Sequence, residues 1–585
     1  MAYKIKDFCL GCHYCALECP VHAIDYKWTK YEIDPDKCIQ CGRCVEVCNV
    51  SAIDTGKPET AAAHEPTELE TDVVIIGAGA GGTIAAVKLA ELTGKRILVL
   101  EKAKKYGGSG WYAGFGISDG PAGGPPGAGP GGPDGAPGGP GGPDGHQGGG
   151  PPMRDTSYLE KLDKDLISNA RAAGDRLNQW LLSMPEVQPY LVETDLGGRK
   201  VHSLTEERIF FNQKCTDGSI GPGKGGSFVI ETMVRQFPKY NIRLLTQTAA
   251  KKILTDESGA VCGVLASDPG GEVRIICKAV IAASGSYTHN DELLAKFVPW
   301  FFPGEDNPNC EPVHRFAAPT DTGDIVELGE SCGAFVDYDA FCINLFGPVH
   351  HPFTFSMFNA QLSGGQMTVN MDGRRFYNEG QMGAGSAPIV YQPRRMFYTI
   401  YDTPGLESAM ENSIRSRRGV EGEYMKRWRQ DIQEELDSHN GVSLFVCDTM
   451  EELAEQTGIN RENLLDEVKH YNKMCEKGVD EDFGKAARFM TPIVTPPFYA
   501  IFGKMATDGA FGGVLVNPDM NVYKADKSGV IPGFYAVGDN ASGVQANAGV
   551  PGDHRLKVFT DFQWAANGGY LAAEKCAAFL GWKAL

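Results

Sequence analysis

The chain has 585 residues and a formal net charge of −19 at pH 7. This length is enough for three or four domains with a large core, and the acidic balance argues against binding to nucleic acid or to an anionic membrane surface. No apolar run approaches the ~20 residues that span a bilayer. The N-terminal sequence MAYKIKDFCLGC has neither an apolar export segment nor a twin arginine, so we expect a cytoplasmic protein.

Eight of the 17 cysteines fall within the first 48 residues. They follow C-x2-C-x2-C-x3-C-P once and then again, with Asn49 in place of the proline. Bacterial two-cluster ferredoxins have this spacing, and the fourth cysteine of each run ligates the other cluster. The repeat predicts two [4Fe-4S] clusters, one held by Cys9, Cys12, Cys15 and Cys48 and the other by Cys19, Cys38, Cys41 and Cys44. Two structural zinc sites are the alternative, which the spacing disfavours because zinc usually takes widely separated CxxC pairs.

We expect residues 1–56 to form this ferredoxin-type domain and residues 57–70 to form a linker, because the second stretch is polar, contains two prolines and lacks periodicity. Iron–sulfur clusters of this type carry single electrons and can be strongly reducing. The N-terminal domain therefore predicts an electron-transfer role.

A strand, a glycine-rich turn, a helix and a second strand follow. Val73–Ile76 is a short apolar run rich in β-branched residues, which predicts a buried strand. The glycines of the GxGxxG motif that follows are Gly77, Gly79 and Gly82. The first permits a tight turn, the second lets a pyrophosphate approach the backbone, and the third lets the helix pack on the strand. The second strand, Arg96–Leu100, ends at Glu101, whose carboxylate can bind ribose hydroxyls, so we expect a dinucleotide.

The stretch EKAKKYGGSGWYAGFG, residues 101–116, resembles the continuation of this motif in the fumarate reductase/succinate dehydrogenase flavoprotein family, whose superfamily includes flavocytochromes c and 3-ketosteroid dehydrogenases. The resemblance covers residues 70–585 apart from one insert and implies that the cofactor is FAD. Family members that hold flavin covalently carry a histidine just after this glycine pair. Ser109 stands there in this chain, so we expect non-covalent FAD.

The insert, residues 120–152, consists largely of glycine and proline without a strict three-residue period, which excludes a collagen helix. Such a composition cannot build a core. A solvated loop and a lid or partner-docking element remain alternatives for it.

Further elements can be placed by periodicity and capping signals. We expect helices over Asp155–Leu182 and Gly221–Phe237, and strands at Ile242–Leu245 and Val261–Ala266. Thr449 and Glu452 form a capping box for a later helix, and Gly458 is expected to end it. Three later segments, KAVIAASGSYTHN, TDTGDIVELGESCGA and IPGFYAVGDNASGV, resemble stretches of the same family that contact FAD.

The resemblance implies a set of cofactor-binding residues and a fold. The implied residues are Gly77, Gly79, Ala80, Gly81, Gly82, Glu101, Lys102, Gly108, Ser109, Ala250, Ser284, Gly285, Asp324, Asp539, Asn540, Val544 and Gln545. The expected fold class is α/β, with a Rossmann-like FAD-binding domain (71–307 and 496–585) that is interrupted by an α+β capping domain (308–495) and preceded by the small ferredoxin-like 2[4Fe-4S] domain.

The family's active site is only partly present. Fumarate reduction needs a hydride from flavin N5, a proton donor, and cations that hold two carboxylates. His351 matches the first histidine of the family, and the C-terminal arginine has only a shifted counterpart in Arg555. The other site positions of the family fall on Phe358, Asn359, Gly383 and Gly509. Because most of this set is missing while the flavin motifs persist, the resemblance implies a changed substrate.

Phe353, Phe355 and Phe358 lie near His351 in the sequence and indicate an apolar pocket. We therefore expect a largely apolar unsaturated substrate, such as an enone, an arylacrylate or a simple alkene, in place of a dicarboxylate. The candidate catalytic residues are Tyr391, His351, Tyr499, Arg555, His554 and Asp553. Tyrosines serve as donors in the related 3-ketosteroid dehydrogenases. Each candidate also has a structural alternative, as a core residue or in a loop salt bridge.

The expected function is that of an anaerobic reductase. Electrons from a reduced redox protein, either a ferredoxin or an NADH-oxidising partner, would pass through two clusters to FAD and leave as hydride to a C=C bond. No second GxGxxG–acid unit that would bind a nicotinamide cofactor is found. The alternatives are a dehydrogenase running in the opposite direction, a fumarate reductase proper, an adenylylsulfate reductase, or an electron-transfer subunit of a larger complex. A capping domain argues against the last, because a relay needs no substrate lid.

Overall fold

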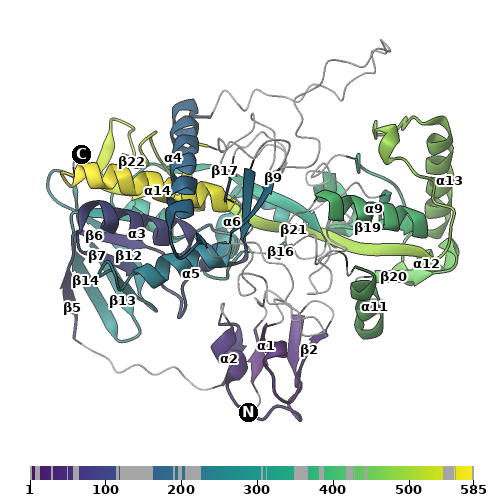
Figure 1. Cartoon of the computed structure of the whole chain (residues 1–585), viewed down its shortest axis with the longest axis horizontal. Helices are drawn as coiled ribbons and strands as arrows, with labels where there is room; N and C mark the ends of the chain where they lie inside the picture. The colour runs from purple at the N-terminus through teal and green to yellow at the C-terminus, as the bar shows by residue number, and fades with distance from the viewer. Residues whose placement is uncertain are drawn as a thin grey trace.

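The computed structural model describes most of the chain in three parts, which Figure 1 shows as the N-terminal module, a part built on helices α3 and α14, and a cap around the far end of strand β21. The described residues are 3–6, 9, 14–27, 30–48, 51–56, 65–113, 117–118, 162–188, 191–195, 200–204, 226–304, 307–310, 313–315, 317–347, 366–380, 388–416, 426, 428–439, 444–544, 559 and 561–582.

The N-terminal module is small and built around its cysteines. Its described elements are β1 (Lys4–Ile5), α1 (Tyr14–Leu17), β2 (Ile24–Lys27), β3 (Lys30–Ile33), α2 (Arg43–Val47) and β4 (Ile53–Asp54). Strand β1 pairs antiparallel with β4, which brings the two ends of the module together, and β2 pairs antiparallel with β3. Its core combines Ala23, Tyr31 and Ala52 with cysteine thiols. A core of this size adds little stability, so bound clusters would contribute to folding.

The second part is organised by one sheet in the order β11-β7-β6-β15-β23-β22. The strands are β6 (Val73–Ile76), β7 (Ile97–Leu100), β11 (Arg243–Leu245), β15 (Ala279–Ala282), β22 (Asn521–Tyr523) and β23 (Val530–Ala536). All neighbours are parallel except β22 with β23. Every residue of β6, β7 and β15 is buried, as expected of parallel strands that are covered on both faces. The strand order reverses between β6 and β15, and a doubly wound sheet binds its ligand at that point.

Helices from distant segments cover this sheet. They are α3 (Ala80–Thr93), α4 (Lys164–Ser183), α5 (Gly226–Gln236) and α14 (Asp561–Phe579). Helices α3 and α14 cross closely, because Gly81 and Gly569 leave no space for a side chain between the two backbones. Figure 1 shows α14 lying along α3, so the C-terminal helix completes a layer that the first helix of the glycine turn begins.

Smaller sheets extend this part. Strands β12 (Ala249–Thr255), β13 (Val261–Asp268) and β14 (Gly271–Ile276) form an antiparallel meander, and β5 (Thr67–Glu70) adds parallel to β14. Strands β8 (Ile117–Ser118), β9 (Leu191–Asp195) and β10 (Lys200–Leu204) form another sheet. Helices α6 (Asp291–Phe297) and α7 (Asp324–Ser331) follow β15. Strand β5, which lies at the end of the expected linker 57–70, thus belongs to a sheet of the second part.

The cap is built around the 18-residue strand β21 (Phe498–Leu515). Its sheet also contains β16 (His314–Arg315), β17 (Val336–Gly347), β18 (Met367–Asn370), β19 (Met396–Asp402), β20 (Leu444–Cys447) and β24 (Ala541–Ser542). The cap helices are α9 (Thr403–Ser416), α11 (Trp428–His439), α12 (Met450–Thr457) and α13 (Arg461–Lys477). Strand β21 starts among these helices and ends beside β24, so one strand runs from the cap into the second part (Figure 1).

Several expectations from the sequence can be checked directly. Strand β6 has the predicted bounds. Glu452 donates its backbone N–H to the Thr449 hydroxyl at 3.2 Å, which is one half of the predicted capping box, while its carboxylate accepts from Gln456 instead. Gly458 caps α12 with φ of 72°, so the predicted end of this helix is confirmed. The helix expected from Asp155 begins later, at Lys164, because the Asp163 side chain accepts hydrogen bonds from two backbone N–H groups of the first turn. Residues 155–161 lie outside the described part of the chain.

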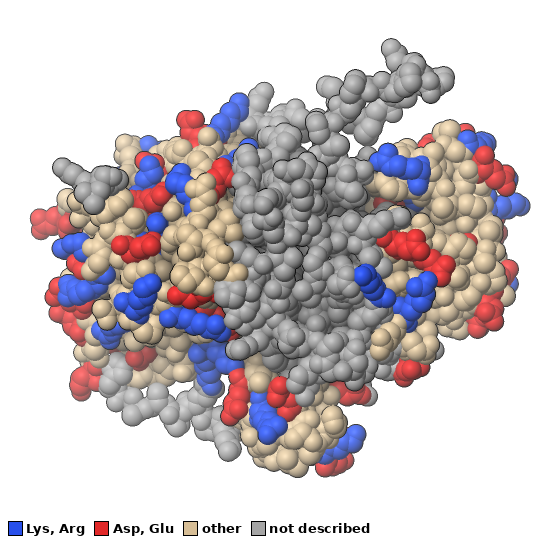
Figure 2. All heavy atoms as spheres, viewed as in Figure 1, with Lys and Arg blue, Asp and Glu red and all other residues tan. Residues whose placement is uncertain are grey.

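The visible surface carries charges of both signs. In Figure 2, Lys and Arg side chains are interspersed with Asp and Glu on the described surface of the second part and of the cap. None of the described helices combines the length and the apolar character needed to cross a bilayer.

Candidate cofactor and active site

Two glycines of the turn after β6 have no room for a side chain. Gly77 has φ of 102°, and a Cβ there would clash with the carbonyl oxygen of Ala283. A Cβ on Gly82 would clash with the Gly77 carbonyl oxygen. A Cβ on Gly79, in contrast, would meet only the Gly107 carbonyl oxygen, at 3.6 Å. The open side of Gly79, directly before α3, is where a pyrophosphate can approach the backbone and the helix N-terminus.

Glu101 follows β7 and lies beside this turn. Its side chain is buried, and its carboxylate accepts hydrogen bonds from the N–H groups of Ala78 at 3.0 Å and Ala103 at 2.8 Å. Burial raises the pKa of Glu101, while these N–H groups and Lys102 act in the opposite direction. A buried carboxylate at the end of the second strand is placed to accept hydrogen bonds from ribose hydroxyls.

Lys102 joins this segment to the start of α7. Its ammonium donates to the Thr322 hydroxyl at 2.6 Å and lies 2.7 Å from Asp324 Oδ2. The Thr322 hydroxyl in turn donates to Asp324 Oδ1 at 2.6 Å. Two segments that the sequence placed at the cofactor, more than 200 positions apart, are therefore locked together by a charge-assisted network.

Asp321 is a site residue that sequence reasoning missed. The Ser109 hydroxyl donates to Asp321 Oδ2 at 2.6 Å and accepts from the Ala318 N–H at 2.6 Å. Asp321 also accepts from the Ser286 hydroxyl at 3.3 Å. Its carboxylate fills the space that a side chain on Gly285 would need. Burial raises the pKa of Asp321 to about 7, although Ser109 and Lys102 oppose that shift.

Asn540 connects the C-terminal segment to this site. Its Nδ2 group donates to the Ser284 hydroxyl at 3.1 Å. Asn540 Oδ1 and Ser542 Oγ are buried and find no partner within the described structure. Buried polar atoms are normally hydrogen-bonded, and leaving one unsatisfied costs about 1–3 kcal/mol. Unused acceptors next to the glycine turn therefore fit a polar cofactor with hydroxyl groups, such as FAD.

The expected cofactor-binding residues come from separate segments, and the contacts above join some of them, while the binding role of each stays a prediction. The described members of that set are Gly77, Gly79, Ala80, Gly81, Gly82, Glu101, Lys102, Gly108, Ser109, Ala250, Ser284, Gly285, Asp324, Asp539, Asn540 and Val544. Gln545 lies outside the described residues. The contacts above join Lys102 to Asp324, Ser109 through Asp321 to Ser286, and Asn540 to Ser284, close to the switch point of the sheet.

Gly509, at the position where the family has its second histidine, has two carboxylates as neighbours. A Cβ on Gly509 would lie 2.9 Å from Asp561 Oδ1 and 3.6 Å from Asp539 Oδ2. A histidine side chain would not fit between them without displacing Asp561. The strand therefore offers no cation at this point to hold a substrate carboxylate.

The candidate proton donors are spread over the fold. Tyr391 lies in the 3₁₀ helix Pro388–Tyr391 and is 71% exposed. Tyr499 is half-buried and pairs with Tyr401 near the start of β21. Ten residues separate it from Gly509, which is about 30 Å along a strand. These placements weigh against both tyrosines, whose roles remain predictions. The other candidates, His351, Asp553, His554 and Arg555, lie outside the described residues.

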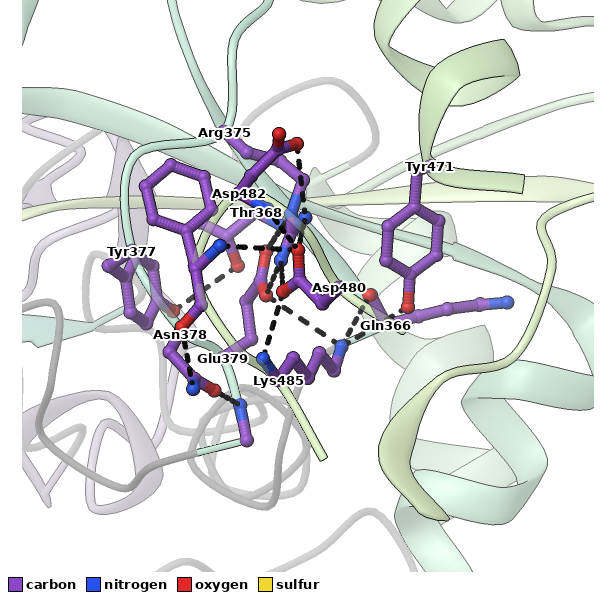
Figure 3. A network of polar contacts seen from close by, with 12 residues as sticks. Gln366, Thr368, Arg375, Tyr377, Asn378, Glu379, Tyr471, Asp480, Asp482 and Lys485 are labelled. Atoms are coloured by element: carbon purple, nitrogen blue, oxygen red, sulfur yellow. Dashed lines mark hydrogen bonds and ion pairs between the residues drawn. The ribbon is translucent and has the colours of Figure 1, made fainter. Parts of the chain in front are cut away.

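A buried ion network holds the cap segment GRRFYNE, residues 373–379 (Figure 3). Arg375 Nη2 lies 2.7 Å from Glu379 Oε2 and 2.9 Å from Asp480 Oδ2, and all three side chains have no exposed surface. The ammonium of Lys485 is 3.7 Å from Glu379 Oε2. Although burial opposes its charge, Glu379 and Asp480 raise the pKa of Arg375. Two buried cations and two buried carboxylates thus lie together within the cap, and the half-exposed Asp482 approaches Arg375 to 3.9 Å. This network fixes Glu379, which also accepts the Thr368 N–H at 2.9 Å.

Four cysteines of the N-terminal module surround one cavity. Its lining includes Cys19, Cys38, Cys41 and Cys44. Burial, together with the charges of the other three thiols, raises the pKa of Cys44 to about 11. This set crosses from one cysteine run to the other in the way that the ferredoxin spacing predicts. Iron would stabilise the thiolates of this set, because a metal ligates the deprotonated form.

The second cysteine set is built alike where it is described. Cys48 Sγ accepts the Ala52 N–H at 3.1 Å, and Cys19 Sγ accepts the Ala23 N–H at 3.2 Å, so both fourth cysteines bond the amide four positions on. Cys12 lies outside the described residues. Within the described residues, no three His, Cys, Asp or Glu side chains converge as they would around a single metal ion. The thiols of the first set instead line a cavity, which suits a cluster of several iron atoms.

The N-terminal module contacts the second part of the protein close to Cys48. Lys105 donates a hydrogen bond from its ammonium to the Glu46 carbonyl oxygen in α2. Burial lowers the pKa of Lys105, whereas Cys48 and then Glu46 act to raise it. Lys105 was not among the residues expected from the sequence, because its partner lies in another domain.

Comparison with known proteins bears on these sites. A model of the FAD binding domain family matches residues 72–137 and 153–552. The chain belongs to the FAD binding domain family. The residues matched in this FAD-binding protein include the glycine turn, the cap and Asn540. The gap between the two matched segments, residues 138–152, falls within the Gly/Pro-rich insert. A second model, a 4Fe-4S dicluster domain, matches residues 8–52, which contain both cysteine runs. FAD and iron–sulfur are therefore its cofactors.

Relatives of this FAD-binding protein are reductases. It is 24% identical over 534 residues to a vinyl phenol reductase of Lactiplantibacillus plantarum, covering 86% of this chain and 96% of the relative. It is 25% identical over 518 residues to a urocanate reductase of Eggerthella lenta, covering 85% and 74%. The open conformation of a flavocytochrome c3 fumarate reductase has a similar fold, with a TM-score of 0.56 and 20% identity over 88% of this chain and 79% of that one. These matches confirm the family and the fold class expected from the sequence.

Proposed function

We propose that this protein is an FAD- and iron–sulfur-dependent reductase of a C=C bond in a largely apolar substrate that is not a dicarboxylate. Gly509 carries this proposal. Where the resemblance expects a histidine that would hold a substrate carboxylate, the strand has no side chain, and Asp561 and Asp539 approach instead. Two relatives are named for the reduction of vinyl phenol and of urocanate, which supports a substrate other than fumarate, although further relatives are named as fumarate reductases.

The residues of the site hold the FAD without a covalent bond in this proposal. The α3 N-terminus at Gly79 takes the pyrophosphate, and Glu101 takes the ribose. Ser109, which stands where covalent members have histidine, already bonds to Asp321 at 2.6 Å and offers no ring nitrogen for attachment. When bound, FAD supplies a hydride at N5 and the two [4Fe-4S] clusters supply single electrons.

The protein must also supply a proton, since reduction of a C=C bond takes a hydride and a proton. The predicted donors His351, Asp553, His554 and Arg555 lie outside the described residues and stay candidates, as do Tyr391 and Tyr499. The electron donor is a reduced one-electron carrier protein. The cap, fixed by its buried ion network, excludes water from the reacting carbon atoms, which strengthens any charge interaction there.

The test is anaerobic reoxidation of the dithionite-reduced holoenzyme, followed by flavin absorbance, with vinyl phenol, urocanate, a simple enone and fumarate at equal concentrations. Vinyl phenol or the enone is expected to reoxidise the flavin at least tenfold faster than fumarate. Rapid reoxidation by fumarate alone would overturn the substrate class. A Lys252→Gln variant, altered on the exposed edge of β12, serves as the control for protein quality.

A further inference from the structure

The N-terminal module is held against the segment that leaves the nucleotide site. Figure 1 places this module below the other two parts, with the described residues of α2 on one side of it. Lys105, from the second part, donates its hydrogen bond to the Glu46 carbonyl oxygen within α2. Cys48 follows this helix directly as its C-terminal cap.

The segment from Glu101 to Gly107, which contains Lys105, is tied at both ends to the expected nucleotide site. Glu101 stands four residues before Lys105, and four residues of extended chain span at most about 14 Å. On the other side, Gly107 donates its N–H to the Ala78 carbonyl oxygen in the glycine turn at 3.0 Å. Lys105 therefore lies between Cys48 and the residues that receive the FAD.

The other cysteine set lies on the open side of the module. Cys41 is exposed, and Ile39 next to it is 61% exposed although it lines the same cavity as Cys38 and Cys44. The described parts of the protein leave this wall of the cavity uncovered. The two cysteine sets are thus unequal: one contains the residue beside Lys105, and the other opens toward solvent.

We propose that Lys105 is a positioning residue that seats the cluster ligated by Cys48 next to the flavin, and that electrons reach this cluster from the one ligated by Cys19, Cys38, Cys41 and Cys44. This inference rests on the proposed function with two clusters. The external carrier loses one electron to the cluster at the open side, which passes it to the Cys48 cluster, and that cluster passes it to FAD. Two such transfers with proton uptake reduce one FAD by two electrons.

The ammonium of Lys105 has a second effect that can be measured without turnover. A positive charge near a cluster stabilises its reduced and more negative form. Lys105→Gln removes that charge and should shift the reduction equilibrium of the Cys48 cluster by about tenfold toward the oxidised form, which is about 59 mV for one electron. The cluster on the open side is further from Lys105 and should keep its potential.

The experiment is a redox titration of the anaerobically purified full-length protein, followed by electron paramagnetic resonance of both clusters. Lys105→Gln is compared with Lys105→Arg, which keeps the charge, and with Lys252→Gln, which removes one from the exposed edge of β12. Cys41→Ser, which changes only the open set, assigns the two signals. Hydrogen exchange of the α2 amides reports the docking itself, and Lys105→Gln should increase that exchange severalfold.

Support requires that only the signal untouched by Cys41→Ser shifts in Lys105→Gln, while Lys105→Arg and Lys252→Gln match the unchanged protein. A shift of the Cys41-dependent signal, an equal shift of both, or no shift together with unchanged exchange of α2 would overturn the inference. A chain that binds fewer than two clusters would instead contradict the proposed function, so the two failures are distinguishable by iron content.

Discussion

Replacing Arg375 by methionine would leave Glu379 and Asp480 as two carboxylates without the cation that they share. The side chains of all three have no exposed surface, and the Arg375 guanidinium lies 2.7 Å and 2.9 Å from the two carboxylates. Lys485, 3.7 Å from Glu379, can offset only part of that charge. Removing one partner of a buried ion pair typically costs 3–5 kcal/mol. For a unit of about 200 residues, roughly 2–4 °C per kcal/mol predicts a fall in the unfolding midpoint of roughly 6–20 °C.

The neighbouring residue provides the matched control. Arg374 pairs with Glu467 at 3.3 Å, but the Arg374 side chain is 46% exposed. Solvent reaches the Arg374 guanidinium, although the Glu467 side chain is only 9% exposed, so Arg374→Met should lower the midpoint by less than Arg375→Met does. Differential scanning calorimetry is the appropriate assay, because a protein of several domains can unfold in separate transitions. Equal shifts in the two variants would refute the reasoning that this network holds the cap.

Three further predictions concern the nucleotide site. Burial raises the pKa of Asp321 from 3.8 to about 7 in the folded protein, so the folded protein without FAD holds a proton on Asp321 that the unfolded chain releases, and its stability falls as the pH rises through this range. Asp321→Asn removes this titration and should flatten the fall of the thermal unfolding midpoint between pH 4 and 8. Gly82→Ala should abolish FAD binding, because its Cβ clashes with the Gly77 carbonyl oxygen, whereas Gly79→Ala should fold and bind FAD on the order of tenfold more weakly, as measured by flavin fluorescence titration. Acid precipitation should release all flavin into the supernatant, since Ser109 cannot form a histidyl link, and flavin in the pellet would contradict non-covalent binding.

Local rules account for the elements that the sequence predicted well. The bounds of Val73–Ile76 followed from four consecutive apolar residues before a glycine motif, because a strand buried on both faces has no polar position. Thr449 and Glu452 were predictable as a cap because the hydroxyl and the N–H that it accepts are three positions apart. In each case the interaction that decides the local structure joins residues only a few positions apart in the sequence.

Interactions between distant segments account for what was missed. Asp321 bonds to Ser109 across 212 positions, and Arg375 bonds to Asp480 across 105. Neither acidic residue has a local pattern that separates it from a solvated one. Lys105 is a similar case, because its partner Glu46 lies 59 positions away in the N-terminal module. The sequence indicated which segments bind the cofactor, but only the fold shows which side chains join them.

Gly509 illustrates how the same local change can act differently on two substrates. A histidine there would give a substrate carboxylate one charge-assisted hydrogen bond, worth about 1.5–3 kcal/mol. Without it, a dicarboxylate loses roughly 10–150-fold in binding at this position. The neighbours of Gly509 are the acids Asp539, from the 3₁₀ helix Gly538–Asn540, and Asp561, from α14. An apolar alkene makes no such bond and loses nothing when the histidine is absent. Gly509 therefore weakens the binding of a dicarboxylate and leaves the binding of an apolar alkene unchanged. For this reason the loss of family site residues argues for a different substrate and not for a lost activity.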